Sequence, residues 1–561
     1  MSGILTRAAL AASLAIQPLA GSAESDSGAY LAARQAGADH DYPAASRYFA
    51  QSLIYDPQNP RLLEAGLAAF VGMGDFGRAR AIADTLVEAG VDSQQGNLVL
   101  FATATADGEW RRIYDLLAEG HSVSPLVDGL VQAWAHLGQG NMTRAVESFD
   151  AVIDADGMQP YGLYHKALAL ASVGDFEGAQ AIFAGGDRGH VTVRSVLAHA
   201  QVLSQLGRNA DAATLIRTVF GDAPDPRLDA ILTRLGAGET LPFDTVTGPR
   251  AGVGEVAHMI AGLIDGETRD EVTLQYAQVA RFLDDTNIDA KILAGTVLQK
   301  LGRAEEAAAA FASVPQDHPA WPGAELGRID ALEDAGDTQA ATDAAAALAQ
   351  ARPDLALPQA RLGDLLRRQD RMEPALDAYT DALDLMEDDD PTRWAVLYTR
   401  AIAAHALGRW DVAEADFRAA LDLNPDQPQV LNYLGYSLVE RGEKLDEALG
   451  MIETAVRQQP QNGAIVDSLG WVLFQLGQYE QAVVHLEDAA ALEAVDPVIN
   501  DHLGDAYWMV GRRTEARFQW TRALSFGPTE AEAEKIRGKL ANGLDRAPEG
   551  AVDMDVATDG G

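Results

Sequence analysis

Residues 463–496 read GAIVDSLGWVLFQLGQYEQAVVHLEDAAALEAVD, and the pattern in this stretch predicts the fold of the chain. Its first half places small or apolar residues at positions i, i+3, i+4 and i+7, one face of an α-helix: Val466, Leu469, Gly470 and Leu473. Its second half carries another such face at Ala482, Leu486 and Ala489. Between them, Gly477 is expected to end the first helix, because glycine readily adopts the left-handed conformation of a C-terminal cap. The stretch therefore predicts a helical hairpin with closely spaced backbones.

A residue expected to end a helix in this way recurs along the chain at intervals close to 34 residues. In the C-terminal half it falls at Gly302, Gly336, Asp370, Gly408, Gly442, Gly477 and Gly511. In the N-terminal half it falls at Gly74, Gly108, Gly140, Gly174 and Gly207. A period of this length indicates stacked helical hairpins, because one hairpin cannot bury its apolar face alone.

The repeats resemble the tetratricopeptide repeat, which has Gly or Ala at position 8, alanine at 20, a large residue at 24, alanine at 27 and proline at 32. The four C-terminal repeats carry this pattern as Ala401, Ala413, Phe417, Ala420 and Pro425; Gly435, Ala448, Ile452, Ala455 and Pro460; Gly470, Ala482, Leu486 and Ala489; and Gly504, Ala516, Trp520, Ala523 and Pro528. The third of them lacks the proline. The resemblance implies an all-α solenoid of about fourteen TPR helix-turn-helix units in two arrays.

The solenoid is expected to be interrupted once. Residues 235–254 (LGAGETLPFDTVTGPRAGVG) are rich in Gly, Thr and Pro and show no helical period, which indicates a connector. We therefore expect an N-terminal array of six repeats at 26–234 and a C-terminal array of eight at 255–530, which opens with a degenerate helix pair. A terminal helix and an acidic disordered tail are expected at 531–561, and a signal peptide at 1–23.

The first 23 residues predict export. Arg7 precedes an apolar run at 8–16, and Gly21-Ser22-Ala23 offers a small-x-small cleavage site. We expect a periplasmic protein cleaved after Ala23; an ordinary alanine-rich first helix in a cytoplasmic protein is the alternative. The apolar run is shorter than the ~20 residues that span a bilayer, and no later stretch reaches that length, so no transmembrane segment is expected.

Composition excludes several classes of protein. The 561 residues include 83 Asp and Glu against 43 Lys and Arg, a net charge of −40, and no cysteine. So acidic a surface repels a phosphate backbone, and no nucleic-acid partner is expected. Without cysteine the chain can form no disulfide, no thiolate nucleophile, no Cys-ligated metal site and no lipid anchor through cysteine.

No catalytic motif stands out in the sequence. The eleven histidines show no metal-ligand spacing, and the three aspartates at 388–390 lack the spaced ligands of a calcium loop. Residues 252–257 (GVGEVA) loosely fit a dinucleotide-binding pattern but follow no strand, so a flexible linker entering a helix explains them better. We expect no catalytic residues, no cofactor and no metal; an enzyme with an unrecognised site remains the alternative.

In tetratricopeptide proteins the first helix of each repeat lines the concave face of the superhelix. Carried onto this chain, the resemblance gives these candidate partner-binding residues: Tyr398, Asn432, Tyr436, Asp467, Trp471, Phe474, Asp501, Asp505 and Trp508. Aromatic residues dominate interaction hot spots, and only 7% of this chain is aromatic. The acidic residues among them favour a basic or apolar protein segment with salt-sensitive association. Alternatively, some of the aromatics pack between repeats or against a capping helix.

A narrower resemblance lies between residues 431 and 524. The motifs LNYLGYSLVERGEKLDEAL, VDSLGWVLFQLGQYEQAV and INDHLGDAYWMVGRRTEARFQW look like the C-terminal region of a family of exported proteobacterial tetratricopeptide proteins. That family includes the adaptor of a periplasmic carboxyl-terminal processing protease that degrades cell-wall hydrolases. The resemblance implies a periplasmic protease or a cell-wall enzyme as partner, although those members are anchored through an N-terminal cysteine and this chain has none.

Three functions are therefore open from the sequence. The leading one is a periplasmic protein-protein interaction scaffold or adaptor that binds a partner along the concave face. The second is a structural spacer that organises envelope assemblies through its ends or its convex surface. The third is an enzyme.

Overall fold

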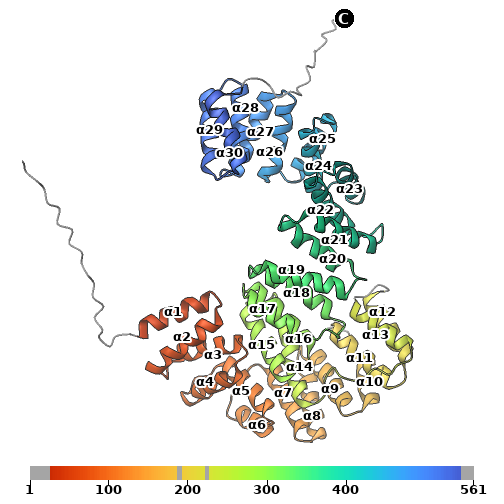
Figure 1. Cartoon of the computed structure of the whole chain (residues 1–561). Helices are drawn as coiled ribbons and strands as arrows, with labels where there is room; N and C mark the ends of the chain where they lie inside the picture. Colours follow the sequence, from red (N-terminus) through yellow and green to blue (C-terminus); the bar gives the residue numbers. More distant parts are fainter. Residues whose placement is uncertain (1–25, 186–191, 222–225, 545–561) are drawn as a thin grey trace, which may run out of the picture. The chain divides into compact units, whose positions relative to one another are not determined.

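The computed structural model describes residues 26–185, 192–221 and 226–544 (Figure 1). These residues form thirty α-helices and no strand, which confirms the all-α class. The predicted signal peptide at 1–23 and the predicted tail beyond residue 544 lie outside them. Within the described ranges, no helix is both long and apolar enough to cross a membrane.

The helices follow one another as fourteen successive pairs, six before the connector and eight after it, in agreement with the repeat count. The first six pairs are α1 (Asp26–Ala38) and α2 (Tyr42–Tyr55), α3 (Pro60–Gly72) and α4 (Phe76–Glu88), α5 (Gln94–Ala106) and α6 (Trp110–Ala118), α7 (Pro125–Gly138) and α8 (Met142–Ile153), α9 (Gln159–Ser172) and α10 (Phe176–Gly185), and α11 (Val193–Gln205) and α12 (Asn209–Phe220). A single helix, α13 (Pro226–Gly236), leads into the connector.

Eight further pairs and a terminal helix follow the connector. They are α14 (Pro249–Ile264) and α15 (Asp270–Leu283), α16 (Ile288–Lys300) and α17 (Ala304–Ala312), α18 (Trp321–Asp334) and α19 (Thr338–Ala351), α20 (Ala356–Arg368) and α21 (Met372–Leu385), α22 (Arg393–Ala406) and α23 (Trp410–Leu423), α24 (Pro428–Glu440) and α25 (Leu445–Gln458), α26 (Gly463–Gln475) and α27 (Tyr479–Leu492), α28 (Pro497–Met509) and α29 (Arg513–Ser525), and finally α30 (Glu530–Asn542).

The twelve periodic residues end the first helices of twelve of the fourteen pairs, as predicted. Gly477 has a φ of 76°, and the following residue, Gln478, donates its backbone N–H to Leu473 O at 2.9 Å, which closes the end of α26. At Asp370 an aspartate takes the place of the glycine and still adopts a left-handed φ of 59°. Asp tolerates this conformation better than most residues, so the first helix of the pair still ends at this position.

Small residues inside the pairs let the helices approach closely. A Cβ at Gly470 would lie 2.5 Å from Leu486 Cγ, and a Cβ at Gly504 would lie 2.5 Å from Trp520 Cδ1. Trp520 is fully buried in this contact. The first helix of the pair therefore needs glycine where the large residue of the second helix packs.

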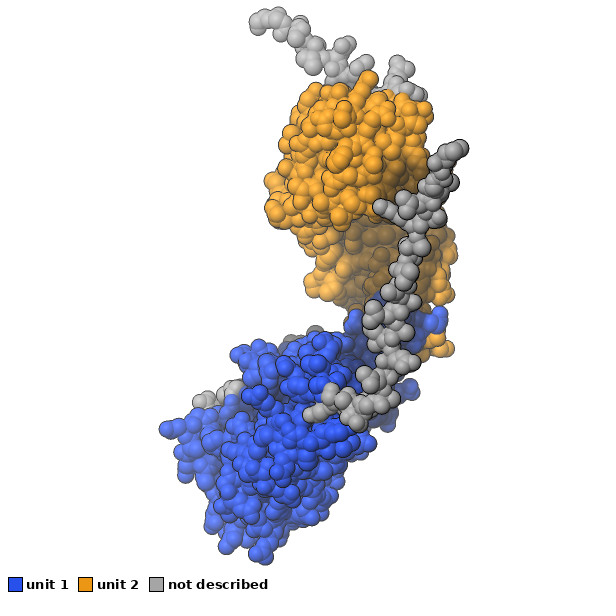
Figure 2. Space-filling model, turned by 90° about the vertical axis from the view of Figure 1, so that its left-hand side faces the viewer, with its two compact units in different colours: residues 1–341 blue, residues 342–561 orange. Residues whose placement is uncertain are grey.

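The chain divides into two compact units, unit 1 at residues 1–341 and unit 2 at residues 342–561 (Figure 2). The boundary falls within α19, whereas the sequence placed the interruption at 235–254. The physical reason lies in the helix pair that follows the connector. Helices α14 and α15 do not simply start a second array: they fold back and pack on α3, α5, α7 and α9.

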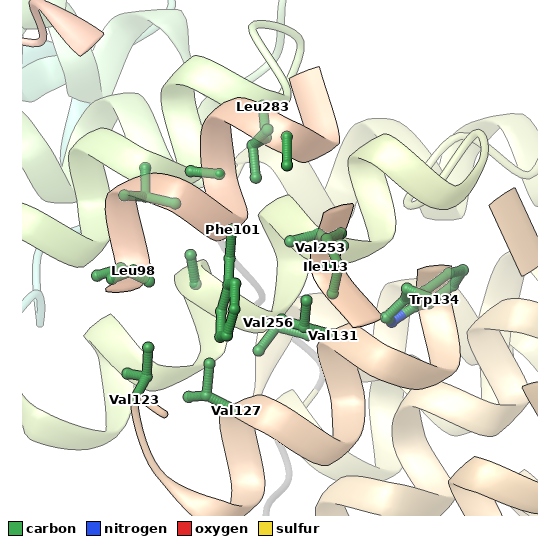
Figure 3. Packing of buried hydrophobic residues seen from close by; sticks show 14 of the residues in the cluster. Leu98, Phe101, Ile113, Val123, Val127, Val131, Trp134, Val253, Val256 and Leu283 are labelled. Atoms are coloured by element: carbon green, nitrogen blue, oxygen red, sulfur yellow. The ribbon is translucent and has the colours of Figure 1, made fainter. Parts of the chain in front are cut away.

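The packing of α14 and α15 on the N-terminal helices forms the largest hydrophobic core of unit 1. Val253 and Val256 of α14 and Leu283 of α15 belong to the same buried cluster as Phe101 of α5 and Val131 of α7 (Figure 3). Residues about 150 positions apart in the sequence are thus packed together. The degenerate helix pair expected after the connector exists, and its apolar faces cover the N-terminal repeats.

The connector is shorter than predicted and is held against α11. Only residues 237–248 lack a helix, because Pro249 occupies a first-turn position of α14, where proline is well tolerated. Leu241 and Val246 are buried, and Leu241 N donates to the Ser204 hydroxyl at 2.8 Å. Residues 249–254, expected in a flexible segment, are therefore helical.

The close contact between α14 and α7 predicts a sharp difference between two glycines of α14. A Cβ at Gly252 would lie 2.3 Å from the Trp134 ring, whereas a Cβ at Gly262 meets nothing within 4 Å. We expect Gly252→Ala to destabilise unit 1 by about 1–3 kcal/mol through overpacking. Gly262→Ala should be neutral or stabilising by up to about 1 kcal/mol, because alanine favours a helix. Calorimetric unfolding of both variants measures the difference; equal melting temperatures would contradict this packing.

Candidate functional site

The nine predicted partner-binding residues lie on the first helices of four successive pairs, α22, α24, α26 and α28. None of the nine is fully exposed. Three of them are buried: Asp467, Phe474 and Asp505. The other six are half-buried: Tyr398, Asn432, Tyr436, Trp471, Asp501 and Trp508. The contacts of each residue decide whether it can still receive a partner.

Trp471 lies at the centre of an aromatic stack. Its ring lies nearly parallel to that of Phe474, with centroids 4.9 Å apart, and to that of His502 on α28, with centroids 4.0 Å apart. Phe474 also meets Tyr479 edge-on at 5.3 Å and is only 2% exposed. Phe474 is therefore a core residue rather than a surface for a partner. Trp471 remains half-buried, held in place by its neighbours.

Asp467 pairs with His502 across adjacent repeats. His502 Nδ1 lies 2.9 Å from one Asp467 oxygen and 3.1 Å from the other, and both side chains are buried. Burial alone lowers the pKa of His502, but the carboxylate of Asp467, with smaller contributions from Asp501 and Asp505, raises it above its ordinary value. The Asp467 carboxylate thus favours the protonated form of the His502 imidazole, whose ring stacks on Trp471.

His502 was not among the predicted residues. Its position on α28, one residue after Asp501, gave no chemical signal by itself in the sequence. The signal lay in the spacing: His502 follows Asp467 by 35 residues, one residue past Asp501, the position equivalent to Asp467 on the next first helix. A search for complementary charges one period apart would have found this pair.

Helix α24 contributes two polar side chains to the same face. Burial, followed by the nearby carboxylates of Glu440 and Asp467, raises the pKa of the Tyr436 hydroxyl well above its ordinary value. Asn432 lies one helical turn before Tyr436, and its amide oxygen is buried without a hydrogen-bond partner among the described residues. An amide with an unused acceptor can bind a backbone N–H of another chain.

Tyr398 on α22 belongs mainly to the packing between repeats. Its ring centroid lies 6.0 Å from that of Phe417 and 6.3 Å from that of Tyr433. Tyr433 also approaches His405 Nδ1 with its hydroxyl at 3.3 Å. These contacts join α22 to α23 and α24. The structure therefore gives Tyr398 a structural role and leaves little of its ring for a partner.

The three candidates on α28 are covered by the end of the chain. Lys539 of α30 places its amine 2.7 Å from an oxygen of Asp501 and 2.7 Å from an oxygen of Asp505. Trp508 donates its indole N–H to Leu544 O at 3.1 Å. The prediction that these residues present an open acidic and aromatic surface is therefore corrected: α30 caps them. The last repeat has no following neighbour, so the terminal helix takes that place.

Burial of these carboxylates has an electrostatic consequence. Burial raises the pKa of Asp505 to about 6, although the Lys539 amine acts in the opposite direction. Asp505 also accepts a hydrogen bond from the Trp520 indole at 2.9 Å. Both acids of α28 are therefore engaged within the chain and add little attraction for a basic partner.

What remains is a contiguous surface, which we call the Trp471 face: Asn432, Tyr436, Asp467, Trp471 and His502. It spans α24, α26 and α28, and α26 contacts both of the other helices. Its centre is the half-buried indole ring of Trp471, supported by stacking; beside it the Asn432 amide oxygen is buried without a partner and the Tyr436 hydroxyl is hydrogen-bonded to Glu440. Such a surface suits a polypeptide, because it combines main-chain hydrogen bonding with an apolar contact.

Among the described residues, no group of three or more His, Asp or Glu side chains could hold a metal ion. Residues 252–257, with the loose dinucleotide-binding pattern, lie within α14, where Gly252 faces Trp134 and Glu255 is buried. Close helix packing explains both glycines, and the flexible-linker interpretation of this segment is corrected.

Comparisons with known proteins agree with the repeat architecture. A tetratricopeptide repeat family model matches residues 130–186, 398–463 and 435–499. The chain is 29% identical over 183 residues to the TPR repeat-containing protein PA4667 of Pseudomonas aeruginosa, covering 32% of this chain and 30% of that protein. It is 29% identical over 184 residues to the human tetratricopeptide repeat protein 7A, covering 30% of this chain and 21% of that protein. The matches thus span less than a third of either relative.

A solved structure was also found over most of the chain. The structure described as the APC/C hetero-tetramer Cut9-Hcn1 matches 93% of this chain and 96% of the matched chain, with 14% identity and a TM-score of 0.38.

The Asp467–His502 pair predicts how stability depends on pH. The pKa of His502 is raised in the folded protein above 6.5, so its contribution is complete below that pH and is lost as the pH rises through the folded value. We therefore expect the wild type to melt above His502→Gln at pH 5.5, and the gap to shrink by pH 8.5. Thermal unfolding at the two pH values measures this gap.

Asp467→Asn is the control, because it removes the carboxylate that raises the pKa of His502. In that background, His502→Gln should show a gap that no longer falls as the pH rises. A wild-type gap that widens with pH would contradict the ion pair.

Proposed function

Because the chain carries tetratricopeptide repeats, we propose that it is a periplasmic scaffold or adaptor that binds a protein partner through the Trp471 face of its C-terminal repeats. One observation carries the proposal. Within the line of first helices, Trp471 keeps a half-buried ring held in place by stacking, whereas Trp508 of the next repeat is covered by Leu544 and the acids beside it are bound by Lys539 of α30. We therefore propose that an external segment binds at the Trp471 face.

The residues of this face define what the partner segment would look like. Asn432 Oδ1 is buried without a hydrogen-bond partner, which costs about 1–3 kcal/mol, so a partner backbone N–H that pairs with it requires the side chain to turn outward. An apolar or aromatic side chain of the partner can pack on Trp471. The acids near this site contribute less than the net charge suggests, because Asp467 is paired with His502, and Asp501 and Asp505 with Lys539.

The location and the class of partner rest on the sequence. Residues 1–23 have the sequence pattern of a signal peptide, and residues 431–524 resemble exported proteobacterial tetratricopeptide proteins. Those proteins include a protease adaptor, so a periplasmic protease or a cell-wall enzyme is the partner class we propose. The Trp471 face lies within that resembling segment.

A spacer that acts through its outer surface is the second candidate function. Val484 of α27 is 56% exposed and Phe518 of α29 is 62% exposed, both on second helices of their pairs, whereas the Trp471 face lies on first helices. Exposed apolar side chains of this size can support a contact with another protein. The two candidates therefore use different helices and can be separated by substitution.

Affinity capture from envelope extracts tests the concave site. We expect Trp471→Ala to weaken capture of the partner by about 30-fold or more, because a buried aromatic hot spot contributes about 2 kcal/mol. Phe518→Ala is the matched control, an aromatic truncated on an exposed second helix, and it should capture the same proteins as the wild type. Melting curves confirm that both variants are folded.

The opposite result decides for the spacer. If Trp471→Ala captures the same proteins at the same yield while Phe518→Ala loses them, the partner binds the second helices and the proposed site is wrong. Asn432→Ala adds an independent measure, because it removes the amide oxygen and leaves the aromatic stack in place.

Export is tested by the mature N-terminus. We expect the protein recovered from the periplasmic fraction to begin at Glu24, because cleavage after Ala23 removes the apolar run. Mass spectrometry of the intact protein measures this end. A cytoplasmic protein that begins at Met1 or Ser2 would contradict the proposed location and leave the binding site itself untouched.

A further inference from the structure

A cavity of about 600 Å³ lies in unit 1, apart from the Trp471 face. Its lining comes from α9, α10, α11, α12 and α14, with single residues from α13 and α16. Most of the lining is apolar, including Leu163, Ile182, Phe183, Val196, Leu215 and Met259. Pockets of 300–1,000 Å³ with apolar walls and a few polar groups are typical sites for small molecules.

The charged groups in the lining neutralise one another. Arg194 Nε donates to Glu255 at 2.6 Å, and Arg194 Nη1 lies 3.3 Å from Asp289. Arg227 Nη1 donates to the other Asp289 oxygen at 2.7 Å. Tyr164 donates its hydroxyl to Glu255 at 2.8 Å. Two guanidinium groups face two carboxylates, so the cavity has no net charge with which to attract an ion.

One polar atom of the lining is unused. His258 Nδ1 is buried and has no hydrogen-bond partner among the described residues. Burial lowers the pKa of His258, so the imidazole is neutral at pH 7 and can accept or donate one hydrogen bond there. A buried polar atom left without a partner is costly, and a ligand group that reaches it recovers that cost.

We propose that this cavity binds a small uncharged molecule with a mainly apolar body and one hydrogen-bonding group that pairs with His258. The apolar walls fit the body of the ligand, the balanced ion pairs exclude a preference for anions or cations, and the unused nitrogen fixes its orientation. The site does not depend on the partner-binding function, because its lining lies wholly in unit 1 and the Trp471 face lies in unit 2.

The structure supplies a clean way to close the cavity. Gly262 of α14 lines it, and a Cβ at this position meets nothing within 4 Å. Gly262→Trp can therefore fill the space without displacing the backbone, and it replaces glycine in a helix by a residue with better helix propensity. Gly262→Ala is the matched control, because a methyl group leaves most of the space open. Leu215→Trp fills the cavity from α12 as a second, independent variant.

The probe is N-phenyl-1-naphthylamine, an uncharged aromatic molecule with one N–H, titrated by its fluorescence against full-length protein. We expect saturable binding to the wild type and to Gly262→Ala, and at least a ten-fold loss of affinity in Gly262→Trp and Leu215→Trp. His258→Phe should weaken binding about two- to ten-fold, the loss expected for one hydrogen bond. The sulfonated relative 8-anilino-1-naphthalenesulfonate should bind more weakly than the uncharged probe.

Several results would overturn the proposal. Equal probe affinity in the wild type and in both cavity-filling variants, with melting curves that show folded protein, would place binding elsewhere. A sulfonated probe that binds more tightly than the neutral one would show that the ion pairs do not balance. An unchanged affinity in His258→Phe would refute the assignment of the hydrogen-bonding group.

Discussion

The structure depends on one constraint: a hairpin of two short helices exposes an apolar face that only another element can cover. In the middle of an array the next hairpin covers it. Elsewhere the chain provides its own cover. Helices α14 and α15 fold back on α3, α5, α7 and α9 and complete the core of unit 1, and α30 caps the last pair. The open surfaces of the molecule are the places where no such cover is needed.

Buried acidic side chains are likewise paired with other residues of the same chain. The chain carries 83 acidic side chains and 43 Lys and Arg, and several of the few cations neutralise acids that packing has buried. Arg194 holds Glu255, which is 2% exposed, Lys539 holds Asp505, and Arg400 binds both oxygens of Asp416 at 2.8 Å. Breaking one partner of such a pair leaves an uncompensated buried charge, which costs several kcal/mol. The net charge of −40 therefore resides mainly on the surface, where it favours solubility rather than a specific partner.

The local parts of the fold could be predicted from the sequence, because each depends on neighbouring residues. Gly477 ends a helix whatever surrounds it, and Gly470 faces Leu486 within one hairpin. The return of α14 could not be predicted, because the contact of Gly252 with Trp134 joins residues more than a hundred positions apart. For the same reason, the repeat pattern placed both Trp471 and Trp508 on first helices, but only the structure shows that Gly543 and Leu544, just after α30, cover Trp508. The repeat pattern predicts on which face of a helix each residue lies, but it does not predict which other part of the chain packs on that face.

The difference between these two tryptophans also limits where a partner can bind. A cover that belongs to the same chain acts at an effective concentration of about the millimolar range. A partner that targeted Trp508, Asp501 and Asp505 would have to displace Lys539 and the indole hydrogen bond to Leu544 before it gained any contact. A partner that targets Trp471 meets an aromatic ring already oriented by Phe474 and His502. Preorganisation and the absence of a competing contact therefore both favour a partner at Trp471, in the last pair but one, over a partner at Trp508 in the last pair.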